Sequence, residues 1–214
     1  MLKKIKSIII LFVIISIFFI ISTDNASCSR EPQNKKNVCK IFKELKKWYK
    51  SADRSEQKWH VPKSILMAII FYESGYRPKV KPPRTTCLYF FPGPRPSSAY
   101  GYAQAIDSTW ENYKFKTGNK RAKRDKFDDA IDFVGWYCNY IHNKCKIRKN
   151  DAYRLYLAYH EGEAGFNKKS YLKKKWLIKR AKSVQKLANI YNSQLIQCEA
   201  ELKRKKGWFC LWPF

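Results

Sequence analysis

The stretch ILMAIIFYESGYRP, residues 65–78, is a strongly apolar helical run that ends on an acidic residue, Glu73. Counting back from Glu73 by three, four and seven residues reaches apolar side chains on the same helical face: Ile70, Ile69 and Leu66. Gly75 and Pro78 end the helix, so the acid lies in its last turn. The pattern therefore predicts either a helix rotated to let Glu73 reach water, or a carboxyl group held partly out of water.

Apolar residues recur at helical spacing along most of the chain, with no convincing strand alternation and no internal repeat. The predicted helices cover about residues 38–50, 62–74, 108–118, 127–141, 151–160 and 177–202. The sequence therefore predicts an all-α domain over residues 37–207. The stretch GWFCLWPF, residues 207–214, is rich in aromatic residues, and we expect residues 208–214 to form a separate aromatic tail.

Several residues mark the expected helix ends. Pro62 occupies the favoured first-turn position of the helix that carries Glu73. The run Ser108-Thr109-Trp110-Glu111 has the pattern of a capping box that opens a short helix. Gly162 and Gly165 are expected to end the helix before them.

A long loop follows the Glu73 helix. The segment KVKPPRTTCLYFFPGPRPSSA, residues 79–99, holds six prolines when Pro78 is included, so it cannot be a helix interior. Loops of this length in a compact domain are usually binding elements or disordered. Cys87 suggests that this one is tied down, and Cys210 is expected to staple the aromatic tail in the same way.

The N-terminus has the layout of an export signal. Three lysines precede an almost wholly apolar run, Ile8 to Ser22, which is short for a membrane span and suits a signal core. Cys28 after small residues suggests a lipoprotein site, while plain cleavage and a retained membrane anchor stay open. We therefore expect residues 1–28 to be a signal or anchor, residues 29–36 to be a polar linker, and the rest of the chain to act in the periplasm or cell envelope.

Cysteine usage agrees with export. Six cysteines follow Cys28, which predicts up to three disulfides whose connectivity the sequence does not fix: Cys39, Cys87, Cys138, Cys145, Cys198 and Cys210. Cys138, His142 and Cys145 share a helical face, but no fourth ligand is evident, so no metal site is predicted. Cys138 and Cys145 would lie roughly 10 Å apart in one helix, beyond disulfide reach. Distant partners, or a helix that ends before Cys145, are expected.

The chain is strongly basic, with 44 Lys and Arg against 17 acids and a net charge of +27. Such a surplus attracts polyanions. Outside the cytoplasm these are acidic lipids, envelope polysaccharide and the peptide acids of the cell wall, so no specific nucleic-acid partner is expected.

Three short segments carry the candidate chemistry, in this order along the chain: FYESGYRP (71–78), SSAYGYAQAIDSTW (97–110) and LAYHEGEAGF (157–166). Together they resemble the signature of the SLT-type lytic transglycosylases of the lysozyme-like superfamily. That family has Glu-Ser at a helix end, then Gly-x-x-Gln followed by Thr, then Ala-Tyr-Asn-x-Gly. The resemblance covers about residues 60–195 and departs at His160, where the family usually has Asn, and in the longer loop after Glu73.

The resemblance implies a lysozyme-like helical fold and cleavage of the β-1,4 bond between N-acetylmuramic acid and N-acetylglucosamine in peptidoglycan, without a cofactor. Glu73 would first protonate the glycosidic oxygen and then take the proton of the sugar's C6 hydroxyl, which closes a 1,6-anhydro ring. One group with both roles must be protonated at rest, and apolar neighbours would keep it so. The residues expected to bind substrate or position the acid are Ser74, Tyr100, Gly101, Tyr102, Gln104 and Tyr159.

Two other functions remain open. A goose-type lysozyme-like muramidase would use the same site with water, activated by Asp107, Glu161 or Glu163. A non-catalytic basic module would bind envelope polymer or nucleic acid through charge alone.

Overall fold

The computed structural model describes residues 31–87 and 91–204, apart from the side chains of Cys87 and Phe91. The expected signal or anchor (residues 1–28), the tail (residues 208–214) and Cys210 lie outside the described residues. No helix within the described part is long and apolar enough to cross a membrane.

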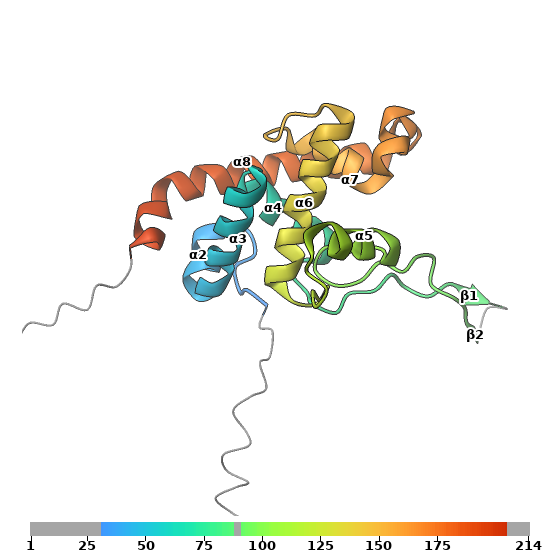
Figure 1. Cartoon of the computed structure of the whole chain (residues 1–214), viewed down its shortest axis with the longest axis horizontal. Helices are drawn as coiled ribbons and strands as arrows, with labels where there is room; N and C mark the ends of the chain where they lie inside the picture. Colours follow the sequence, from blue (N-terminus) through green and yellow to red (C-terminus); the bar gives the residue numbers. More distant parts are fainter. Residues whose placement is uncertain (1–30, 88–90, 205–214) are drawn as a thin grey trace, which may run out of the picture. The chain divides into compact units, whose positions relative to one another are not determined.

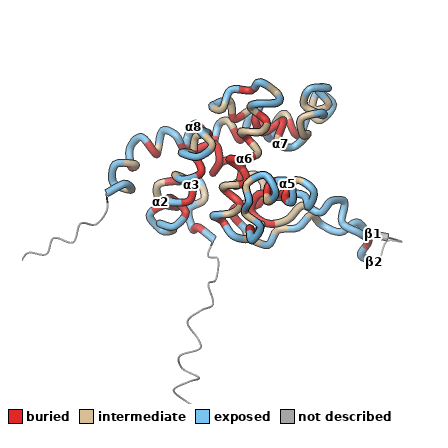
Figure 2. Tube along the Cα trace, viewed as in Figure 1, coloured by how far each residue is buried: buried red, intermediate tan, exposed pale blue. Residues whose placement is uncertain are grey.

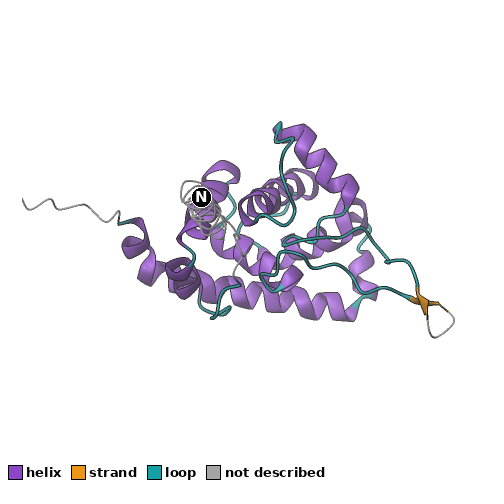
Figure 3. Cartoon of the chain, turned by 90° about the horizontal axis from the view of Figure 1, so that it is seen from below, coloured by secondary structure: helices purple, strands orange, loops and turns teal. Residues whose placement is uncertain are grey.

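The described chain is helical, which confirms the predicted all-α class (Figure 1). Its helices are α2 (Val38–Glu44), α3 (Lys46–Trp59), α4 (Lys63–Ser74), α5 (Asp107–Thr117), α6 (Phe127–Cys145), α7 (Ala152–Asn167), the short 3₁₀ helix η1 (Ser170–Lys173) and α8 (Lys175–Lys203). Two short strands, β1 (Thr86–Cys87) and β2 (Phe91–Pro92), pair antiparallel at the tip of the proline-rich loop (Figure 3).

Helix α4 lies in the core. Every residue from Lys63 to Ile70 is buried, and the helix packs against α8, α6 and α3 (Figure 2). The expectation of a single buried face is therefore too narrow: an apolar helix without a polar side is a core helix. Each fully buried Leu or Ile contributes about 1.5–3 kcal/mol, so the position of α4 is strongly fixed.

Two expected helix boundaries are wrong. Leu45 leaves the helical conformation (φ −118°, ψ 68°) and divides the first predicted helix into α2 and α3. The capping box at Ser108 does not form, because α5 begins earlier with Ile106 as its N-cap, and the Ser98 hydroxyl accepts from the Asp107 N–H at 3.0 Å. At Gly162 (φ 71°, ψ 171°) the chain leaves the helical conformation, so the helix end expected there is confirmed, but a second helical segment of α7 follows and runs past Gly165 to Asn167.

A disulfide between Cys39 and Cys198 joins α2 to α8. Closing a loop with a sequence separation of 159 residues constrains the unfolded chain by roughly 4–5 kcal/mol. Cys138 and Cys145 form no disulfide among the described residues, and α6 runs through both of them, so the expectation of a helix that ends before Cys145 is wrong and distant partners stay a prediction. Both belong to α6, where burial raises the pKa of Cys138 to about 12 and keeps it a core thiol.

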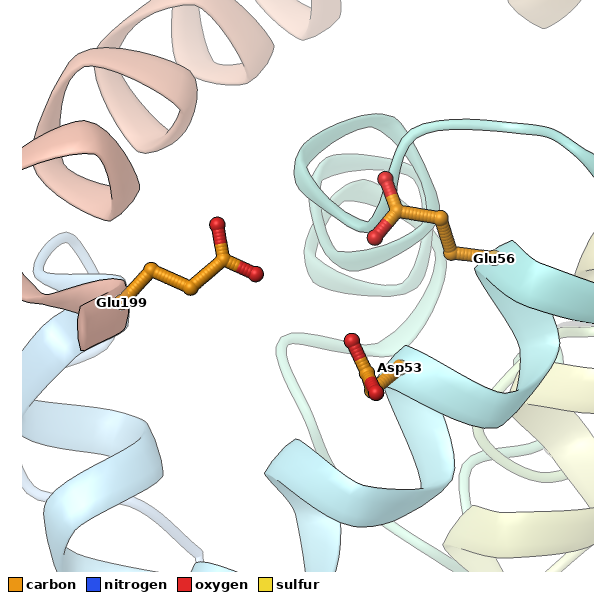
Figure 4. A group of neighbouring side chains, drawn as sticks. All are labelled: Asp53, Glu56 and Glu199. Atoms are coloured by element: carbon orange, nitrogen blue, oxygen red, sulfur yellow. The ribbon is translucent and has the colours of Figure 1, made fainter. Parts of the chain in front are cut away.

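Three carboxylates converge where α3 and α8 approach each other: Asp53, Glu56 and Glu199 (Figure 4). Their oxygens lie within 4.8 Å of one another, a spacing that suits a cation. The Lys63 ammonium supplies that charge, with contacts of 2.8 Å to Asp53, 2.7 Å to Glu56 and 2.5 Å to Glu199, and its side chain is only 5% exposed. We call this group the Lys63 cluster; it joins α3, the start of α4 and the C-terminal half of α8.

The variant Lys63→Met should lower the free energy of unfolding at pH 7 by about 2–4 kcal/mol, because three carboxylates then repel one another without their cation. The burial of Glu199 disfavours its charge, but Lys63 outweighs this and lowers the Glu199 pKa. The stabilisation is therefore present above pH 4.5 and is lost as the pH falls through the lower folded pKa. Denaturant titrations at pH 7 and pH 3.5 measure the difference between variant and wild type, which should shrink at the acid pH.

The matched control is Lys43→Met, which removes the exposed pair Lys43–Glu201. It should change stability by less than about 1 kcal/mol at either pH. An equal loss in both variants would contradict a specific role for the Lys63 cluster.

Candidate active site

Helix α4 delivers Glu73 to a cavity. Gly75 caps the helix in the left-handed conformation (φ 61°), and its N–H donates to the Phe71 carbonyl at 2.8 Å. The Glu73 residue is half-buried, but its Oε1 oxygen is fully buried and has no hydrogen-bond partner among the described residues. It lines a cavity of about 520 Å³, called here the Glu73 cavity. The other lining residues are Ser97, Ala99, Gln104, Ala105, Ile106, Thr109, Phe133, Tyr137, Tyr159, His160, Glu161 and Gly162.

Burial dominates the electrostatics of Glu73. Loss of water raises its pKa from 4.5 to about 7, although a hydrogen bond from Tyr156 and the positive charge of Arg180 act to lower it. The acid is therefore largely protonated below neutral pH, and a carboxylate is accessible just above it. Its pKa falls in the range that general acid–base catalysis requires.

Part of the cavity wall comes from α7 and from the turn at residues 100–105. The Tyr159 hydroxyl donates to the Ala103 carbonyl at 2.7 Å, which joins α7 to this turn. Gln104 adopts a left-handed conformation (φ 48°), and its Nε2 donates to Val80 at 3.0 Å and to Gly101 at 2.8 Å. These bonds hold the turn closed and fix the Gln104 side chain at the cavity.

Three of the seven predicted site residues line the Glu73 cavity: Glu73, Gln104 and Tyr159. Ser74 is buried, and its hydroxyl donates to the Ile70 carbonyl of its own helix at 3.2 Å. Tyr100 belongs to a neighbouring cavity. These two residues flank the site without lining the cavity.

Gly101 and Tyr102 support the turn from behind. A Cβ on Gly101 (φ 80°) would lie 2.1 Å from the Arg124 carbonyl oxygen, so only glycine permits this close approach. Tyr102 is buried in the core, with its ring 5.7 Å from Trp48 and 5.6 Å from Phe127. Both residues shape the site through packing.

The structure adds neighbours of Glu73 that the sequence analysis missed. Tyr156 lies one helical turn before Tyr159 on α7, so the spacing could have indicated it. Arg180 comes from α8, and it donates to the Tyr72 carbonyl at 3.3 Å. No local sequence pattern connects Arg180 to Glu73, because the proximity of these two residues depends on how α8 packs against α4.

A second carboxyl group, Glu161, lines the same cavity. Its side chain is 3% exposed and contacts Lys174 at 2.7 Å and His160 at 3.1 Å, and Ser170 donates to it. Burial opposes its charge, but Lys174, Ser170 and His160 outweigh burial and lower the pKa of Glu161. The cavity thus holds one acid biased toward its protonated form and one biased toward its ionised form, a division typical of acid–base sites.

The other two carboxylates considered as water activators lie elsewhere. Asp107 pairs with Arg124 at 2.7 Å and lines the neighbouring cavity. Glu163 accepts from the Tyr140 hydroxyl at 2.6 Å and is not among the residues that line the Glu73 cavity.

A protein-family model described as the transglycosylase SLT domain matches residues 13–198. The matched range contains every residue that lines the Glu73 cavity. A comparison with curated proteins finds no match.

The raised pKa of Glu73 predicts a pH-dependent stability effect. Between pH 4.5 and 7 the folded chain holds this proton more tightly than the unfolded chain, so the free energy of unfolding falls as the pH rises. In Glu73→Gln this loss disappears, and the variant should gain up to about 3 kcal/mol relative to wild type between pH 4 and pH 8. Denaturant titrations across that range measure the gain.

The exposed variant Glu111→Gln serves as the control, since Glu111 pairs with Lys114 at the surface. It should show no comparable gain. Parallel stability curves for Glu73→Gln and wild type would show that the folded state does not withhold Glu73 from water.

Proposed function

The chain belongs to the transglycosylase SLT domain family of the lysozyme-like superfamily, and from this membership we propose that it cleaves peptidoglycan strands as a lytic transglycosylase with Glu73 as its catalytic acid and base. The observation that carries the proposal is the Glu73 Oε1 oxygen, which is buried at the wall of the cavity without a hydrogen-bond partner in the described part of the chain. A buried oxygen without a donor favours the neutral acid, and the neutral acid is the form that can protonate a glycosidic oxygen.

In the proposed reaction, Glu73 donates its proton to the oxygen between N-acetylmuramic acid and N-acetylglucosamine, and the C–O bond on the muramic side breaks. The N-acetyl group of the substrate stabilises the anomeric carbon. The Glu73 carboxylate then accepts the proton of the C6 hydroxyl, whose oxygen closes the 1,6-anhydro ring. Glu73 thus regains the proton that it donated, so the reaction consumes no water.

Two neighbours make this exchange feasible. Tyr156 and Arg180 both favour the ionised form of Glu73, by a hydrogen bond and by charge. They would stabilise the carboxylate after the first proton transfer, while burial restores the acid after the second. We assign Tyr156 and Arg180 as positioning residues on this basis.

The cavity wall supplies candidate contacts to the sugars. Phe133 and Tyr137 present aromatic rings to the cavity, and such rings pack against the apolar faces of sugars. The two donors of Gln104 are engaged with backbone carbonyls, so its amide oxygen is the group to accept from an acetamido N–H. Ser74, Tyr100, Gly101 and Tyr102 would act by holding the helix end and the turn in place.

The family acts on peptidoglycan, so an exported envelope location is implied. We propose that residues 1–28 direct this export, with Cys28 as the candidate lipidation site.

A second candidate function is hydrolysis at the same site. Glu161 favours it, because an ionised carboxylate that shares the cavity with a protonated acid could activate water. Against it, both oxygens of Glu161 are already engaged by Lys174, His160 and Ser170. This makes Glu161 a poorer base than a free carboxylate, and the transglycosylase reaction is preferred.

Digestion of purified peptidoglycan by Glu73→Gln should be at least about 100-fold slower than by wild type, since an amide cannot supply the proton. For wild type, the rate should fall as the pH rises through about 7, because the protonated acid is lost. Turbidity assays of wall suspensions from pH 5 to pH 9 give both results. Unchanged digestion by a folded Glu73→Gln protein would refute the assignment and favour the non-catalytic basic module.

Mass spectrometry of the products separates the two reactions. Wild type should release chains that end in 1,6-anhydro-muramic acid, and Glu161→Gln should leave that product unchanged while lowering the rate no more than about tenfold. Reducing ends in the wild-type digest, abolished in Glu161→Gln, would establish the hydrolase instead.

A further inference from the structure

A second cavity lies next to the candidate active site. It has a volume of about 480 Å³ and is formed by the proline-rich loop, the segment after it and Arg124. We call it the basic cavity, because the described residues that line it include three cations and one carboxylate: Lys81, Arg95 and Arg124 against Asp107.

The charges in this cavity are unequally paired. Arg124 contacts Asp107 at 2.7 Å, which neutralises one cation. Neither Lys81 nor Arg95 takes part in an ion pair within the described part of the chain. Two cations therefore line the cavity without an ion-pair partner in the described residues, and an anionic group of a ligand could pair with them.

The cavity is organised around the Tyr100 ring. The Arg124 guanidinium lies 5.4 Å and the Lys81 ammonium 5.3 Å from its centroid. Arg124 also donates to the carbonyls of Ser98 at 3.0 Å and Ala105 at 2.8 Å. The Arg95 guanidinium donates to the Pro82 carbonyl, which ties the two sides of the loop together. These hydrogen bonds position Arg124 and Arg95 before any ligand arrives, which reduces the entropy lost on binding.

The basic cavity adjoins the Glu73 cavity, because Ser97 and Ala99 line both. A ligand with a sugar beside Glu73 could therefore extend a substituent past Ser97 toward Lys81 and Arg95. In peptidoglycan the muramic acid carries such a substituent, a short peptide that ends in carboxylates.

We propose that the basic cavity binds a carboxylate of the peptide attached to muramic acid, through Lys81 and Arg95, and so selects peptide-bearing strands over stripped ones. This rests on the proposed function for the identity of the substrate. It assigns the long loop after Glu73 a role in substrate choice.

Binding can be measured without turnover. The probe is a soluble muramyl tripeptide with free carboxylates, compared by calorimetry with the same compound whose carboxylates are amidated. Wild type should bind the acid form about tenfold more tightly, since charge-assisted hydrogen bonds contribute at least that much. In the double variant Lys81→Ala/Arg95→Ala this preference should disappear. Lys182→Ala, which removes an exposed lysine of α8, is the matched control and should keep it.

A second experiment measures the digestion of peptidoglycan strands. Digestion of intact peptidoglycan by Lys81→Ala/Arg95→Ala should require several-fold more substrate for half-maximal rate, while digestion of strands stripped by an amidase should be unchanged. Equal effects on both substrates, equal binding of acid and amidated probes, or the same loss in Lys182→Ala would overturn the proposal. Tighter binding of a glycerol-phosphate polymer than of the acid probe would also overturn it. If wild type digests neither substrate but keeps the charge-dependent binding, the proposed reaction fails and the carboxylate site stands.

Discussion

The burial of α4 is the constraint on which the candidate site depends. A helix enclosed from Lys63 to Ile70 cannot rotate to expose its last turn, so Glu73 is carried to the edge of the core. The chain then turns away at once through Gly75 (φ 61°) and Tyr76 (φ 64°). The left-handed conformation costs roughly 1–2 kcal/mol for a non-glycine residue. Tyr76 can hold it because its hydroxyl donates to the Met67 carbonyl at 3.1 Å and meets the Tyr191 hydroxyl at 3.0 Å inside the core.

Local desolvation outweighs the charge of the whole molecule at Glu73. A net charge of +27 favours the ionised form of every carboxyl group, and Arg180 adds to this from close range. The pKa nevertheless rises to about 7, because the removal of water acts directly on the carboxyl oxygens while distant surface charges are screened. Glu161, buried in the same cavity, shows the opposite balance, since three polar partners compensate for its burial. Partners, rather than burial alone, decide which acid keeps its proton.

The sequence predicted those features that depend on neighbours along the chain. The position of Glu73 at a helix end followed from helical spacing and from Gly75, and the order of three motifs brought Gln104 and Tyr159 to the same site. Features set by packing could not be read in this way: Tyr102 lies among core aromatics, and Arg180 reaches the site from α8. The failed capping box has the same origin, because a hydroxyl from the preceding loop caps α5 in place of its own side chain.

Helix α8 connects the stability of the fold to the chemistry of the site. Arg180 and Cys198 are separated by eighteen positions, about five full helical turns, so they project from the same face of α8. The disulfide to Cys39 and the ion pair between Glu199 and Lys63 are adjacent on the chain and together fix the rotation of α8 about its axis. Because a helix transmits rotation along its length, these two links also fix the side of α8 from which Arg180 projects. Two bonds at the C-terminal end of α8, outside the Glu73 cavity, thus help to place the positive charge of Arg180 beside Glu73.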